Sequence, residues 1–171
     1  TLEAGGEQGR RNLMMRSKIA IPLFVSATLL PAACIVMAAI RGGFWIWAAL
    51  ISMTFLVFAM DRSGMRIKAY STLANWLPIT IGFVHFAVLW TGLWAVGNGT
   101  YLDLEEKVLL VVTLGLFAGQ VSNAAAHELI HRRDRFARNL GTAVFSSLLN
   151  GQHVSAHLLV HHVHAGTMKD P

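Results

Sequence analysis

The chain has 171 residues, of which 54% are hydrophobic and only 13% charged, and its mean hydropathy is +0.52. Soluble domains carry about 25% charged residues, so this composition excludes an ordinary soluble domain and indicates an integral membrane protein. The net charge of +5 does not indicate a nucleic-acid partner, because the basic residues gather at the ends of apolar stretches, where membrane topology explains them. The single cysteine, Cys34, offers neither a disulfide nor a cysteine metal site.

Four apolar stretches are long enough to cross a hydrocarbon core as helices, which takes about 20 residues. They cover approximately residues 19–40, 43–60, 73–96 and 107–126. The first two are separated only by Arg41, Gly42 and Gly43, so we expect a tight helical hairpin whose turn uses the backbone freedom of glycine. The fold class predicted is all-α, a polytopic membrane helical bundle with about four transmembrane helices and a histidine-rich helical segment.

The charges between the spans predict one orientation. Basic residues precede the first span, follow the second and follow the fourth: Arg10, Arg11, Arg16, Lys18, Arg62, Arg66, Lys68, Arg132, Arg133, Arg135 and Arg138. By the positive-inside rule these segments are cytoplasmic. We therefore expect a cytoplasmic N-terminal tail (1–18), a transmembrane region (19–126) and a cytoplasmic histidine-box region (127–171).

The fourth span is predicted in most detail. Asp103 and Glu106 have the spacing of a capping box, which would start the helix just outside the membrane. His127 follows Lys107 by twenty residues, or about 30 Å of helix, so it should emerge at the inner interface. A stripe of small and polar residues, expected to face the bundle interior, recurs at every fourth position: Gly115, Gly119, Asn123, His127 and His131.

Two histidine clusters follow this span, HELIH at His127–His131 and HLLVHH at His157–His162. Residues four apart share a helix face, so each cluster offers a clamp of two imidazoles. Seven of the eight histidines lie between positions 127 and 164. Protonated imidazoles this crowded would repel one another unless a metal kept them neutral, so we expect one or two metal ions between the clamps.

HELIH also matches the HExxH motif of zinc proteases, in which Glu128 would act as general base. A membrane metalloprotease is therefore an alternative. One zinc needs only three protein ligands, however, which leaves most of the histidines unexplained. A haem protein is a third class and ranks last, because it needs histidines inside the spans and only His85 has such a position.

The segments HELIHR (His127–Arg132) and HLLVHHVHAGTMKDP (His157–Pro171) resemble the first two histidine boxes of the membrane alkane hydroxylases and xylene monooxygenases, within the membrane fatty-acid desaturase superfamily. The family's tail, V-x-x-x-T-x-x-DP, is also kept. The resemblance covers roughly residues 107–171. It implies a bacterial inner-membrane enzyme with two non-haem iron ions, which hydroxylates an unactivated C–H bond of an alkane, alkyl or lipid-like substrate with dioxygen. Fatty-acid desaturation is an alternative, because both reactions begin with the same hydrogen abstraction.

Carried over by position, the resemblance implies five iron ligands: His127, His131, His157, His161 and His162. Glu128 and Asp170 would orient such ligands through hydrogen bonds. Ala156 and Val160 stand where alkane hydroxylases usually have Glu and Gly, which indicates a distant subfamily. The family has a third histidine box downstream, so we expect that this sequence is an incomplete hydroxylase.

The other histidines receive structural interpretations. For His153 we favour a hydrogen-bonded interfacial role over an extension of the clamp face, His164 is interpreted as structural, and His85 should make an interhelical hydrogen bond. The arginines from Arg132 to Arg138 are explained by topology, although they could dock an acidic electron donor such as rubredoxin or ferredoxin with its reductase. The remaining partners expected are the lipid bilayer and a hydrophobic small-molecule substrate.

Overall fold

The structure is a computed structural model that describes residues 25–63, 72–161, 163 and 165. Every regular element in these ranges is a helix, so the predicted all-α class is confirmed. The helix Val25–Arg41 and α2 (Phe44–Ser63) form the predicted hairpin, and α3 (Thr72–Asn98) follows it. The tail 1–18 and its basic residues lie outside the described residues.

Two helices in the described part are long and apolar enough to cross a membrane, Asn75–Asn98 within α3 and Leu104–Ile130. The second is one continuous rod made of three pieces: α4 (Leu104–Phe117), the π-helical turn η1 (Ala118–Ser122) and α5 (Asn123–Ile130). The apolar helices of the first hairpin are shorter, Val25–Arg41 and Phe44–Phe55. Two of the four predicted spans are thereby supported, and the other two stay predictions.

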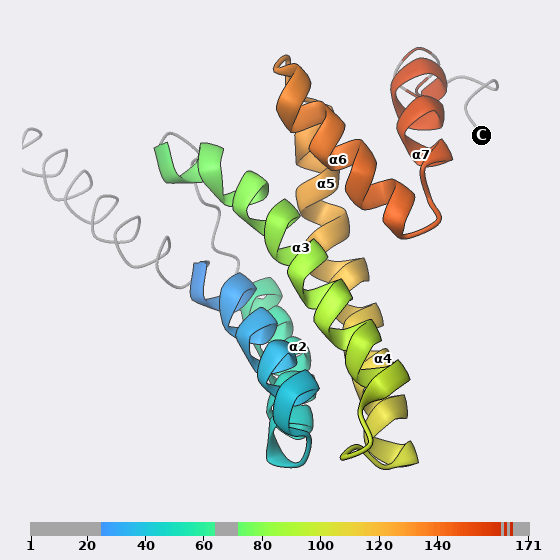
Figure 1. The fold of residues 1–171 in the computed structure, drawn as a ribbon. Helices are drawn as coiled ribbons and strands as arrows, with labels where there is room; N and C mark the ends of the chain where they lie inside the picture. The colour runs from blue at the N-terminus through green and yellow to red at the C-terminus, as the bar shows by residue number, and fades with distance from the viewer. Residues whose placement is uncertain (1–24, 64–71, 162, 164, 166–171) are drawn as a thin grey trace, which may run out of the picture.

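Figure 1 shows α3 crossing the α4–α5 rod, with the hairpin beside them. The hairpin packs on the rod through α2 and α4. One core joins these helices, and its fully buried members include Ile35, Ile46, Met53, Leu110 and Phe117. Close packing of such side chains holds helices together even where the surroundings are as apolar as the core itself.

The turn between the first two helices depends on its glycines, as predicted. Gly42 and Gly43 have φ of 63° and 57°, and a Cβ on Gly42 would lie 2.6 Å from Leu102 Cδ2. The Gly43 N–H donates to Glu106 Oε1 at 2.6 Å, while the Asp103 N–H donates to Glu106 Oε2 at 3.1 Å. Glu106 N–H donates in turn to Asp103 Oδ1 at 2.8 Å, so the predicted capping box is confirmed, and its carboxylate also fastens the hairpin turn.

The small-residue stripe does not face the bundle interior among the described residues, so that prediction is wrong for Gly115, Gly119 and Asn123. All three are exposed, and no atom lies within 4 Å of a Cβ built on either glycine. The buried face carries Phe117 and Val121 instead. Phe117 and Val121 also lie four residues apart and stay on one buried face through η1, so the four-residue spacing identifies a helix face but does not tell which face the neighbouring helices cover.

After the rod, the chain folds back through α6 (Arg135–Ser147), which packs along α5. Asp134 caps α6 by accepting from the Ala137 N–H at 2.9 Å. The contact is unusually close at Gly141, where a Cβ would lie 2.8 Å from Ala126 O and 2.8 Å from Leu129 Cβ. The reversal carries α7 (Gln152–Ser155) and the π-helical turn η2 (Ala156–His161) back toward the end of α5.

Candidate metal centre

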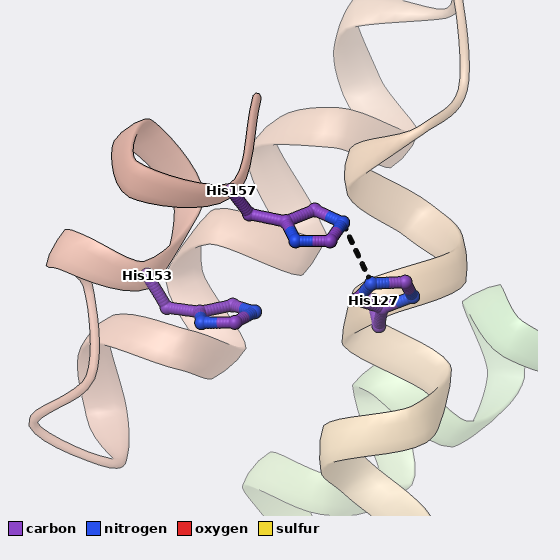
Figure 2. A group of neighbouring side chains, drawn as sticks. All are labelled: His127, His153 and His157. Atoms are coloured by element: carbon purple, nitrogen blue, oxygen red, sulfur yellow. Dashed lines mark hydrogen bonds between the residues drawn. The ribbon is translucent and has the colours of Figure 1, made fainter. Parts of the chain in front are cut away.

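The two histidine clusters meet in space, although they lie some thirty residues apart in the chain. Figure 2 shows His153 and His157, from α7 and η2, pointing toward His127 on α5. The Nε2 atom of His157 lies 2.9 Å from Nε2 of His127 and 3.1 Å from Nε2 of His131. Three ring nitrogens from two segments therefore converge on one small volume.

Ring contacts extend this cluster to a fourth predicted ligand. The rings of His127 and His131 lie 4.8 Å apart, and those of His157 and His161 stack at 5.3 Å with 18° between their planes. Four of the five predicted iron ligands are thus brought together. His162 and Asp170, like His164, lie outside the described residues.

Local backbone structure explains why these rings meet. His127 is in the last turn of α5 and His131 is its C-cap residue, with φ −80° and ψ −9°, so the chain stays helical just long enough to bring the two rings together edge to face, with 68° between their planes. A cation held by these rings would also be favoured at this end, because the helix dipole attracts positive charge there. His157 and His161 lie on η2, whose i to i+5 winding brings residues four apart near one face.

The nitrogen spacing fits a metal ion. Imidazole nitrogens bind first-row metals at about 2.1 Å, which puts two ligands about 3.0 Å apart at right angles and about 3.4 Å apart in a tetrahedron. The observed Nε2 separations of 2.9 and 3.1 Å match the right-angled case. Imidazole suits iron, zinc, copper and nickel, so the donor set is compatible with iron and does not select it.

His153 joins the cluster, which is the alternative that the sequence disfavoured. Its ring stacks on His157 at 5.2 Å with 17° between the planes, and the ring nitrogens of His127, His153 and His157 all lie within 4.8 Å of one another. The His153 ring also contacts the buried Phe145, at a centroid distance of 4.9 Å. One feature of the sequence did indicate this position, because His153 lies four residues before His157 and residues four apart share a helix face.

His85 makes the interhelical hydrogen bonds that were predicted for it. It is buried, with Nδ1 2.9 Å from Ser122 Oγ on η1 and Nε2 2.8 Å from Ser147 Oγ on α6. Ser147 donates its own proton to Val144 O at 2.7 Å, so it accepts from Nε2–H, and Nδ1 of a neutral ring accepts from Ser122. Both ring nitrogens are engaged, which argues against His85 as a haem ligand.

Arg132 and Glu128 flank the cluster. Arg132 Nη1 donates to the carbonyl of Asn75 at 2.6 Å, which ties the end of α5 to the start of α3. Its Nη2 lies 4.0 Å from Glu128 Oε1, and the Glu128 side chain is 63% exposed. A hydrogen bond from Glu128 to a metal ligand stays a prediction.

Comparison with known proteins finds a distant similarity to an alkane monooxygenase. Over 92 residues, or 54% of this chain, the sequence is 32% identical to alkane 1-monooxygenase 2 of Alcanivorax borkumensis. The match covers 24% of that protein's length, so the chain spans about a quarter of the relative. No family model matches the sequence, and no solved structure matches the fold.

Proposed function

We propose that this protein is a membrane-bound, non-haem di-iron monooxygenase that hydroxylates an unactivated C–H bond of an alkane, alkyl or other lipid-like substrate. The observation that carries the proposal is the convergence of Nε2 atoms from His127, His131 and His157, two of them from one histidine box and one from the other. The similarity to an alkane 1-monooxygenase supports the reaction class.

In this proposal His127, His131, His157 and His161 hold iron, together with His162. When bound, the iron pair supplies the step that no side chain provides, activation of dioxygen. The reaction balances as one dioxygen, two electrons and two protons consumed per alcohol and water formed. The protein's contribution is to fix the imidazoles in one geometry, while Glu128 and Asp170 hold the orientation of ligand rings through hydrogen bonds.

The position of the cluster suits a substrate that arrives from the bilayer. His127 lies near the end of a rod that is able to cross a membrane, so an alkyl chain held between the helices would end beside the metal. We place this end at the cytoplasmic face of a bacterial inner membrane. Arg133 and Arg135 are exposed there and offer a basic surface to an acidic electron donor such as rubredoxin or ferredoxin, reduced by its reductase.

Fatty-acid desaturation is a variant of the same proposal, and a zinc metalloprotease is the second candidate. The protease is favoured by one observation, because His127, His131 and His157 would serve a single zinc with three nitrogens. One further feature favours the oxygenase, because His153 and His161 add imidazoles beyond the three that a single zinc needs.

The test uses full-length protein in lipid nanodiscs with an electron-transfer partner, NADH and a medium-chain alkane. Alcohol formation is followed by gas chromatography, and bound metal by elemental analysis. We expect iron and oxygen-dependent alcohol, both lost in His131→Ala and kept in the neighbouring control Gln152→Ala. One equivalent of zinc with cleavage of a peptide substrate would instead establish the protease.

A further inference from the structure

We infer that His153 is a metal ligand outside the two histidine boxes, so that this chain builds a three-imidazole site from His127, His153 and His157 for a divalent first-row cation. The inference rests on the proposed function for the presence of a metal, and it goes further by adding a ligand that the box pattern does not contain.

The first support is distance. The ring nitrogens of the three residues lie within 4.8 Å of one another, and the His127–His157 pair is already at 2.9 Å. Ligands at right angles and about 2.1 Å from a metal lie about 3.0 Å apart, so the longest separation, at most 4.8 Å, has to close by at most about 1.8 Å. A small rotation of one ring or a slight shift of α7 supplies that movement.

The second support is the way His153 is held. Its ring contacts both the fully buried Phe145, at 4.9 Å, and the ring of His157, at 5.2 Å. Figure 2 shows the ring directed at the space between the other two histidines rather than away from it. The contact with Phe145 restricts the ring, and one ring nitrogen faces the cluster, as in a ligand oriented by its surroundings.

The third support is the spacing along α7 and η2. His153, His157 and His161 form a ladder of near-parallel rings, with 17° and 18° between successive planes. A ladder built only for packing needs no nitrogen at its first position, and phenylalanine would serve there equally well. The packing role and the ligand role therefore predict different results for His153→Phe.

The experiment titrates Co²⁺ into metal-free, full-length protein in detergent and follows the visible absorption of the bound ion. Changes to residues that only orient ligands weaken metal binding about 10–100-fold, so loss of a ligand should cost at least about tenfold in affinity. We expect this loss, with a changed spectrum, in both His153→Phe and His153→Gln, and wild-type binding in Gln152→Ala. His153→Gln keeps a polar head group and is the second variant if the Phe variant does not fold.

Wild-type affinity and spectrum in either folded His153 variant would overturn the inference. The proposed function would survive that result provided that His157→Ala still abolished binding. If His157→Ala also bound Co²⁺ like the wild type, both the inference and the metal centre of the proposed function would fail.

Discussion

Replacing Gly141 with alanine should disturb the metal centre from a distance. The added Cβ would lie 2.8 Å from Ala126 O and 2.8 Å from Leu129 Cβ. A backbone carbonyl cannot rotate away, so α6 has to move off α5. Overpacking of this kind costs about 1–3 kcal/mol, and the helix propensity gained by alanine offsets about 0.5–1 kcal/mol of it.

The displacement matters for the site because α6 carries α7 and η2. Moving α6 lengthens the 2.9 Å separation between the Nε2 atoms of His127 and His157. We expect Gly141→Ala to lower the thermal unfolding midpoint in detergent and to weaken Co²⁺ binding. The matched control is Gly115→Ala, because no atom lies within 4 Å of its Cβ. Equal stability and equal metal affinity in the two variants would refute the reasoning.

Three further substitutions test single contacts. Glu106→Gln weakens the hydrogen bonds that the Glu106 carboxylate accepts from two backbone N–H groups, so it should reduce the free energy of unfolding by about 1 kcal/mol, measured by thermal unfolding. An equal loss in the exposed control Glu105→Gln would contradict this. His85→Ala removes the ring that joins α3, η1 and α6 and should cost about 1–3 kcal/mol; an unchanged unfolding midpoint would show that the hydrogen bonds contribute nothing. Arg132→Ala removes the hydrogen bond that joins the end of α5 to α3, so it should weaken Co²⁺ binding more than Arg133→Ala, a change at an exposed residue. Equal Co²⁺ affinities in the two variants would count against a positioning role for Arg132.

Features governed by local chain geometry were predictable from the sequence. The capping box of Asp103 and Glu106 depends on a three-residue spacing, and the hairpin turn depends on two adjacent glycines. That His85 would be hydrogen-bonded followed from the cost of burying an unpaired polar group, although its partners on other helices, Ser122 and Ser147, could not be named from the sequence. The first two features follow from residue spacing alone, and the third follows from a cost that applies to any buried polar group.

Features governed by tertiary packing were not predictable in this way. The four-residue period put Gly115 and Gly119 on one face of the helix, but only the packed structure shows that the neighbouring helices cover the face of Phe117 and Val121 instead. The fold-back of α6 depends on the close approach at Gly141, which no local spacing reveals. The same fold-back brings His153 to His127, and for that reason its place in the cluster became visible only with the helices packed.

X-ray absorption at the iron edge of the iron-loaded, full-length protein would count the nitrogens around the metal. We predict a shell dominated by imidazole nitrogens at about 2.1 Å, which loses imidazole scattering in His157→Ala. An iron shell made mainly of carboxylate oxygens, or one that His157→Ala leaves unchanged, would contradict a centre built from both histidine clusters.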